Sequence, residues 1–287
     1  MSNSECAIRV CIRGVRGSYP VPGPRTLHYG GNTTCHEVRA GGHLFVFDAG
    51  TGIIPLGDEL AAEHRVSRKP MQVNLLYTHV HHDHVYGFLY FKPAYYRTTT
   101  LRIFGPKTFA GTIHESLREL TVSPFHPVAV DEMGSEMQFT DLVGGETLRF
   151  RQDVEAPEVV RLRETYTMRR GDVMIRTVAN PNHTKLGVLH YRIDCGGKSF
   201  VFATDVEGTE GGEPTLSAFA AGADLLAHDG QYTDFDYYQD TPPKKGWGHS
   251  TYKMACATAQ KAGVKQLVLI HHDPDRDDKG VEALEAE

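Results

Sequence analysis

The stretch T-H-V-H-H-D-H at residues 78–84 contains His79, His81, Asp83 and His84, whose side chains are common metal ligands. Residues two apart in an extended chain project the same way, so His79 and His81 can bind one ion together. Asp83 and His84 can then reach a second ion. Imidazole nitrogens combined with a carboxylate suit zinc and related transition metals, whereas calcium and magnesium favour oxygen ligands. The spacing predicts a metal site; the alternative is a polar loop that happens to be rich in histidine.

Buried strands are needed to position this motif. Residues 73–77, directly before it, form a continuous apolar run that is typical of a strand covered on both faces. Further short apolar runs predict strands at 7–12, 36–39, 44–47, 173–178, 188–193, 200–202, 224–227 and 266–270. Residues 250–262 are alanine-rich, start with Ser/Thr capping residues and stop before Gly263, which predicts a helix. A short exposed helix is expected at 279–287.

One segment of the chain recurs. R-A-G-G-H-L-F-V-F-D at 39–48 is matched by D-C-G-G-K-S-F-V-F-A-T-D at 194–205, with the Gly-Gly and Phe-Val-Phe elements at the same spacing. Either two unrelated hairpins share their diglycine turn chemistry, or half of the domain is duplicated. Duplication predicts an α/β, four-layer αββα sandwich built from two similar halves. We expect a single domain over 1–287, with a less typical insertion at about 92–172.

The motif H-x-H-x-D-H after a strand resembles the signature of the metallo-β-lactamase superfamily. The resemblance covers most of the chain and implies the metallo-β-lactamase fold, with further ligands at the ends of later strands. The matching positions are His183 in N-P-N-H, Asp205 after F-V-F-A-T and His271 after L-V-L-I. By this resemblance, His79, His81 and His183 bind one Zn²⁺, Asp83, His84 and His271 bind another, and Asp205 bridges the two. Mn²⁺ is an alternative metal. His272, next to a ligand, matches no role that the resemblance implies, and we expect it to lie behind the ligands or to be exposed.

Two later motifs resemble the ribonuclease Z-like, phosphodiesterase branch of this superfamily. L-L-A-H-D-G at 225–230 is similar to its H-[DE]-A motif, and G-W-G-H-S-T at 246–251 to its G-H-S motif. The resemblance implies that His249 is a general acid oriented by Asp229, and Asp83 is expected to serve both metal binding and catalysis. The loop at 14–35 resembles the first loop of these enzymes, but Gly-Asn-Thr-Thr replaces their Arg-Asn pair, so Asn32 and Thr33 have no assigned role.

The resemblance implies hydrolysis of a small phosphodiester, with a cyclic nucleotide or related cyclic phosphate preferred. A hydroxide between the metals would attack phosphorus, and His249 would protonate the leaving oxygen. The alternative is a tRNA 3′-processing endonuclease of the ribonuclease Z type. Such enzymes carry a basic, Gly/Pro-rich arm that the middle of this chain lacks. A lactonase or thioesterase is less favoured, because those reactions do not usually rely on a G-H-S histidine.

Charge and composition restrict the partners. The chain has 30 Lys+Arg against 36 Asp+Glu, a formal net charge of −6, and we expect no duplex nucleic acid partner. It has no apolar run long enough to span a bilayer and no secretory signal, so a cytoplasmic protein without membrane contact is expected. Its 5 cysteines are scattered and predict no disulfide framework. A homodimer is expected from the resemblance. We expect the charged segment 151–172 to be a solvent-exposed excursion of the chain. The alternatives are a lid or a contact with another subunit.

Overall fold

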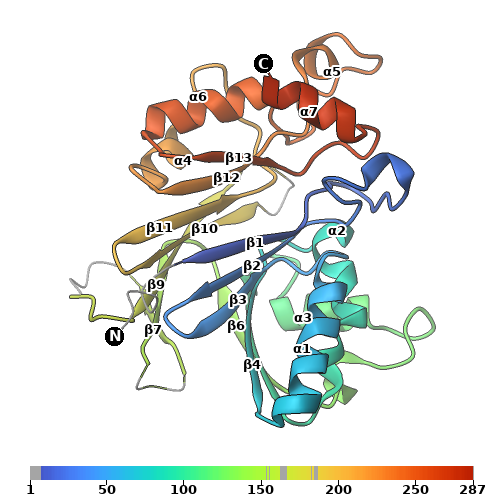
Figure 1. The fold of residues 1–287 in the computed structure, drawn as a ribbon, viewed down its shortest axis with the longest axis vertical. Coiled ribbons are helices and arrows are strands. Elements are labelled where there is room, and N and C mark those ends of the chain that lie inside the picture. The colour runs from blue at the N-terminus through green and yellow to red at the C-terminus, as the bar shows by residue number, and fades with distance from the viewer. Residues whose placement is uncertain are drawn as a thin grey trace.

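A computed structural model describes residues 8–152, 154, 156–161, 167–181, 183 and 187–286. Its first sheet has six strands in the order β1-β2-β3-β4-β5-β6 (Figure 1). The strands are Arg9–Gly14 (β1), Cys35–Ala40 (β2), His43–Phe47 (β3), Met71–Leu76 (β4), Thr99–Pro106 (β5) and Glu136–Leu142 (β6). The first three pair antiparallel, and β3 to β6 run parallel.

The second sheet has seven strands in the order β13-β12-β11-β10-β9-β7-β8. The strands are Glu146–Phe150 (β7), Glu158–Arg161 (β8), Val173–Asn180 (β9), Val188–Cys195 (β10), Lys198–Ala203 (β11), Leu225–Asp229 (β12) and Leu267–Ile270 (β13). β9, β10 and β11 pair antiparallel, whereas β11, β12 and β13 run parallel. The hairpin β10–β11 followed by parallel β12 repeats the pattern of β2–β3 followed by parallel β4.

Helices cover the outer faces of both sheets, which gives the four layers that the sequence predicts (Figure 1). The helices are Ile53–Ser67 (α1), His82–Val85 (α2), Ile113–Leu120 (α3), Pro214–Phe219 (α4), Asp234–Tyr238 (α5), Tyr252–Ala262 (α6) and Asp278–Ala286 (α7). The predicted helix at 250–262 is confirmed as α6: the Thr251 side chain caps its first turn, and Gly263 ends it in the left-handed conformation. The described helices include none long and apolar enough to cross a membrane.

The repeated Phe-Val-Phe segments explain how the sheets pack. Phe45 and Phe47 of β3 and Phe200 and Phe202 of β11 lie in the core between the two sheets, and the ring centroids of Phe47 and Phe202 are 5.6 Å apart. The valines between them point the other way, toward the helices. Alternation along each strand therefore divides its side chains between two cores. The prediction of two similar halves in a layered α/β fold is confirmed.

The middle of the chain is more regular than the sequence indicates. β5 and β6 extend the first sheet, and β7 joins the second. The charged segment 151–172, expected as a solvated excursion, includes the edge strand β8 and the buried carboxylate of Asp172. Its residues Asp153, Glu155, Arg163 and Glu164 lie outside the described residues, as do Cys6, Ala7 of the first predicted strand and Glu287 of the last helix. The cysteines that are described form no disulfide.

Candidate metal centre

The predicted ligands come together where strands of both sheets end. β4 leads into the 78–84 motif, whose second half forms α2, while His183 follows β9, Asp205 follows β11 and His271 follows β13. Two hydrogen bonds join the sheets directly beneath the motif: Leu189 N donates to Thr78 O at 2.9 Å, and the Tyr191 hydroxyl donates to Tyr77 O at 2.7 Å. The core between the sheets thus sets the relative position of the ligands.

The side chains form two adjoining groups. Ligand atoms of His79, His81, His183 and Asp205 lie within 4.8 Å of one another, and so do those of Asp83, His84 and His271. Asp205 faces both groups. Its Oδ1 is 3.2 Å from His183 Nε2, while its Oδ2 is 3.2 Å from His84 Nε2. One carboxylate can therefore contact a cation in each group, which is the bridging position expected from the sequence.

These separations fit bound metal ions. Tetrahedral ligands about 2.0–2.1 Å from zinc lie about 3.3 Å from each other. His271 Nε2 is 3.1 Å from Asp83 Oδ2 and 3.3 Å from His84 Nε2, so the second group matches that geometry. In the first group, the buried Nε2 atoms of His79 and His183 have no hydrogen-bond partner. Buried polar atoms are rarely left unsatisfied, so a cation between these nitrogens accounts for them.

Each buried histidine among the candidate ligands is oriented by a hydrogen bond from its other ring nitrogen. His183 Nδ1 donates to Gly248 O at 2.9 Å, and His271 Nδ1 donates to Gln231 Oε1 at 3.0 Å. Nδ1 of His79 is 3.0 Å from the Thr78 hydroxyl. With the proton held on Nδ1, the lone pair of Nε2 points into the centre. Metal-binding histidines typically have this arrangement.

Asp48, which follows β3, is a functional residue that the sequence analysis missed. Its Oδ2 accepts hydrogen bonds from His84 Nδ1 and the Thr78 hydroxyl, both at 2.8 Å, and its Oδ1 accepts one from Thr78 N at 2.7 Å. It is fully buried and has a positive φ of 59°. Asp48 therefore orients His84 directly and His79 through Thr78. A carboxylate directly after a buried Phe-Val-Phe strand is the signal that could have revealed it.

Replacing Asp48 with asparagine should weaken metal binding. Loss of such an outer hydrogen-bond partner typically costs about 10- to 100-fold in metal affinity, and competition with a coloured chelator measures that change. The matched control is Asp58→Asn, because Asp58 is a half-exposed carboxylate paired with Lys92 on the surface. Equal metal affinity of the Asp48 and Asp58 variants would show that Asp48 does not support the centre.

The electrostatics of the second group favour positive charge. Burial lowers the pKa of His84, but the carboxylates of Asp83, Asp205 and Asp48 outweigh it and hold that pKa well above its usual value. Burial also lowers the pKa of His271, but Asp205 and Asp83 outweigh this effect and raise that pKa to about 9. Asp205 stays ionised because neighbouring histidines outweigh its burial and hold its pKa well below the usual range. Cations can take the place of these protons.

The predicted acid–base pair lies beside the second group. His249 Nδ1 donates to Asp229 Oδ2 at 2.7 Å, and the His249 and His271 rings stack at 4.9 Å with an interplanar angle of 16°. Burial raises the pKa of Asp229, but His249 outweighs it and lowers that pKa overall. Asp229 thus holds a proton on His249 Nδ1 and leaves Nε2 free to face a substrate. The donor atoms of His249, Asp205 and His271 also lie within 4.8 Å of one another.

The loop that follows β1 contacts the centre from the other side. Ser18 N donates to Asp83 Oδ2 at 2.8 Å, and a Cβ on Gly17 would lie 2.3 Å from the His271 ring, so only glycine fits there. Asn32 and Thr33, whose role the sequence left open, hydrogen-bond to Thr51 at the start of α1 instead of reaching the metal ligands. They fix the loop rather than contact a metal.

His272 is buried, so the expectation of an exposed residue is wrong, and none of the groups of candidate ligands among the described residues includes it. Burial, with Arg276 and Arg16 nearby, lowers its pKa to about 3. Its backbone N donates to Val15 O at 2.8 Å, which attaches the end of β13 to the loop after β1.

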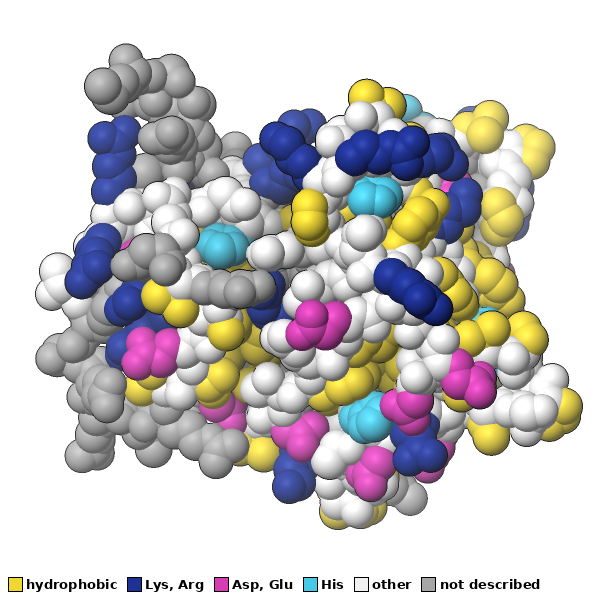
Figure 2. Space-filling model, turned by 90° about the horizontal axis from the view of Figure 1, so that it is seen from below, with side chains coloured by type: hydrophobic (Ala, Val, Ile, Leu, Met, Phe, Trp, Pro, Cys, Tyr) yellow, Lys and Arg dark blue, Asp and Glu magenta, His cyan; other side chains and the backbone are white. Residues whose placement is uncertain are grey.

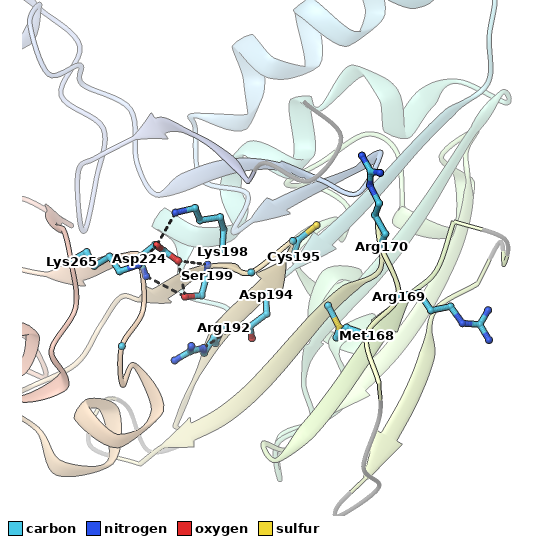
Figure 3. Close-up of a pocket in the computed structure, with 13 residues that line it drawn as sticks. Met168, Arg169, Arg170, Arg192, Asp194, Cys195, Lys198, Ser199, Asp224 and Lys265 are labelled. Carbon is cyan, nitrogen blue, oxygen red and sulfur yellow. Dashed lines mark hydrogen bonds and ion pairs between the residues drawn. The ribbon is translucent and has the colours of Figure 1, made fainter. Parts of the chain in front are cut away.

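A cleft of about 400 Å³ opens onto the centre. It is lined by Ser18, Val80, His81, His82, Asp83, Asp205, His249 and His271. A larger cavity of about 760 Å³ lies around the β10–β11 turn, at the opposite end of β11 from Asp205 (Figure 3). Its basic side chains largely face acidic ones: Lys198 and Lys265 contact Asp224 at 3.2 and 2.7 Å. The predicted ligands line the smaller cleft and not this cavity.

Comparison with known proteins gives consistent matches. Residues 43–272 match the model of the beta-lactamase superfamily domain. Ribonuclease Z from Mycobacterium avium (strain 104) is 29% identical over 284 residues, which cover 93% of this chain and 86% of the relative. Two solved structures share the fold: human tRNase Z, short form, with a TM-score of 0.59, 17% identity and 92% of each chain covered, and a diphosphatase from the PhnP family, with a TM-score of 0.61, 15% identity, and 96% and 91% covered.

Proposed function

We propose that this chain, a hydrolase that belongs to the beta-lactamase superfamily, is a metal-dependent phosphodiesterase. The observation that carries this proposal is the hydrogen bond of 2.7 Å between His249 and Asp229, directly beside the candidate metal ligands around Asp205. Hydrolysis of an alkyl phosphodiester releases a poor leaving group, which needs a proton. A histidine beside a metal cleft, with its Nδ1 proton held by a carboxylate, can supply that proton from Nε2 when both ring nitrogens are protonated.

We assign one metal ion to His79, His81 and His183, a second to Asp83, His84 and His271, and both to Asp205. The chemistry of this donor set favours zinc, with manganese as the alternative. Two divalent cations in such a site lower the pKa of water and offset charge on the phosphoryl oxygens. Their positive charge would attract an anionic substrate to a chain whose formal net charge is −6.

The protein's own residues position and protonate the substrate. The oxygen of a water molecule bonds to phosphorus while the bond between phosphorus and the leaving oxygen breaks. His249 gives the proton on Nε2 to the leaving oxygen and is reprotonated by the proton that the water releases, so one water is consumed. Asp229 keeps the Nδ1 proton of His249 in place throughout. The products are a phosphomonoester and an alcohol, which remain in one molecule when the substrate is a cyclic phosphate.

A small phosphodiester, preferably a cyclic nucleotide or related cyclic phosphate, is the proposed substrate. The cleft volume of about 400 Å³ suits a ligand of that size. Figure 2 shows one end of the molecule, where hydrophobic side chains are mixed with charged ones. Basic side chains are more frequent in the upper half of the view, and acidic side chains in the lower half. Basic side chains do not join into one continuous surface on this face.

The second candidate is tRNA 3′ processing. It is favoured by the ribonuclease Z name of the Mycobacterium avium relative, which aligns with 93% of this chain. A lactonase or thioesterase is disfavoured by the His249–Asp229 pair, because carboxylic ester hydrolysis does not need it.

A substrate panel tests the proposal. It compares 3′,5′-cyclic nucleotides, bis(p-nitrophenyl) phosphate, a precursor tRNA and a lactone, each with the purified protein and added zinc or manganese. We expect hydrolysis of both small phosphodiesters and none of the lactone. Cleavage of precursor tRNA without cleavage of cyclic nucleotides would establish the second candidate instead. Hydrolysis of the lactone alone would overturn both.

A further inference from the structure

Ser18 is an exposed polar residue that lines the metal cleft without being a candidate ligand. It lies beside the second group of ligands, because its backbone nitrogen donates to Asp83 Oδ2 at 2.8 Å. Its side chain lies near Gln231, whose Nε2 is 3.4 Å from Ser18 Oγ. The other amide atom of Gln231 accepts from His271 Nδ1. Ser18 is therefore placed against both a candidate ligand and the residue that orients another one.

The backbone of Ser18 adopts a conformation that favours glycine. Its φ is 63°, and Tyr19 N donates to Gly17 O at 2.7 Å across it. Such a three-residue turn with a positive central φ is rare and strained, and glycine would adopt it at lower cost. The turn itself thus gives no reason for a serine, and the strain indicates a use for the side chain.

The same backbone conformation recurs around the centre. The described residues include five with a positive φ that are not glycine. Arg68 is one of them and ends α1 in a left-handed cap. Three others are Asp48, Asp205 and His271, whose side chains form or support the candidate metal centre. The fifth is Ser18. Strained backbone gathers at functional sites, so its place in this set indicates that Ser18 also has a function there.

The chemistry that Ser18 offers is hydrogen-bond donation. Its oxygen can accept from Gln231 Nε2, and among the described residues its hydroxyl donates to no partner, so the hydrogen is available to a ligand in the cleft. The non-bridging oxygens of a phosphodiester carry its negative charge, and hydrogen bonds to ionised oxygens are stronger than those between neutral groups. A donor that the backbone holds in place before the reaction needs no reorganisation during it.

We propose that Ser18 is a catalytic residue whose hydroxyl donates a hydrogen bond to a non-bridging oxygen of the phosphoryl group while water attacks phosphorus. This inference rests on the proposed phosphodiesterase function and adds a residue to it. The hydroxyl keeps its proton and forms no covalent bond; it offsets charge on the oxygen. Every phosphodiester carries non-bridging oxygens, so the contribution of Ser18 does not depend on the leaving group, in contrast to that of His249.

Two substitutions separate the hydroxyl from the backbone. Ser18→Ala removes the hydroxyl and keeps a side chain at positive φ, whereas Ser18→Gly removes it and relieves the turn. In the metal-loaded enzyme, both should lower kcat/KM about tenfold or more, a typical contribution of a hydrogen bond to a charged group. The loss should be equal for bis(p-nitrophenyl) phosphate and for a diester that releases an alkoxide. Both variants should keep their metals, because the backbone nitrogen still donates to Asp83. Ser67→Ala, at the exposed end of α1, is the matched control and should change nothing.

Binding of inorganic phosphate gives a readout that needs no turnover. Measured by calorimetry on the metal-loaded protein, it should weaken about tenfold in both Ser18 variants. Suppose that wild type cleaves the diesters. The Ser18 proposal is then wrong if both variants match wild type, if only Ser18→Ala is impaired, if the loss is confined to the poor leaving group, or if metal is lost; the phosphodiesterase function stands in each case. If wild type cleaves neither diester, the proposed function itself fails.

Discussion

Replacing Asp205 with asparagine should remove the metal pair and reduce kcat by at least about 10³-fold, because metal ions supply several kcal/mol of transition-state stabilisation. Asp205 is 1% exposed and presents one carboxylate oxygen to each group of ligands. An amide keeps the shape but loses the charge and one of the two acceptor oxygens. Each cation site then loses a ligand, and the negative charge that offsets the cations falls as well.

Metal content by mass spectrometry and kcat on bis(p-nitrophenyl) phosphate measure the effect. Asp224→Asn is the matched control, because Asp224 is a carboxylate at the opposite end of the same sheet, paired with Lys198 and Lys265. That control should keep its metals and its kcat. An Asp205→Asn protein with undiminished metal content would show that this carboxylate does not bridge two sites.

His249→Ala should have the second-largest effect, and the effect should depend on the leaving group. General acid catalysis contributes about 10²- to 10⁴-fold, so kcat for a diester that releases an alkoxide should fall by about that factor. p-Nitrophenolate departs without a proton, so kcat for bis(p-nitrophenyl) phosphate should change much less. Metal content should stay the same, because Asp229 rather than a cation holds His249 Nδ1.

The two substrates, measured on the same His249→Ala preparation, separate loss of the acid from general damage. An equal fall for both substrates, together with lost metal, would make His249 a metal ligand instead. Its donor atoms lie close enough to those of Asp205 and His271 for that outcome to be a real test.

The positions of the candidate ligands could be predicted because each follows a short buried strand, and strand ends in a layered α/β fold converge. The residues that hydrogen-bond to those ligands could not be predicted. Asp48 approaches His84 from 36 residues away along the chain, and Gln231 approaches His271 from 40 residues away. Each of these hydrogen bonds joins the ends of two neighbouring parallel strands, β3 and β4 or β12 and β13, that are far apart in the sequence. The sequence near His84 or His271 therefore does not mark the partner.

The elements that the sequence analysis missed also have physical causes. β5 contains Arg102, which is only 3% exposed, and this charge interrupts the apolar run that would mark a buried strand. α1 contains Pro55 and Gly57, both unfavourable in helix interiors. Pro55 lies in the first turn, where no backbone donor is lost. Gly57 packs against Phe91 and Lys92, where a Cβ would approach within 2.9 Å, so tertiary contact outweighs propensity.

Removal and return of the metal test the central claim most directly. The protein should be purified without added metal, analysed for transition metals by mass spectrometry, treated with a chelator and then assayed on bis(p-nitrophenyl) phosphate before and after titration with zinc or manganese. We expect two divalent ions per chain, loss of hydrolysis after chelation and recovery that is complete at two equivalents. A protein that carries no transition metal and hydrolyses the diester equally well after chelation would contradict a paired-cation centre.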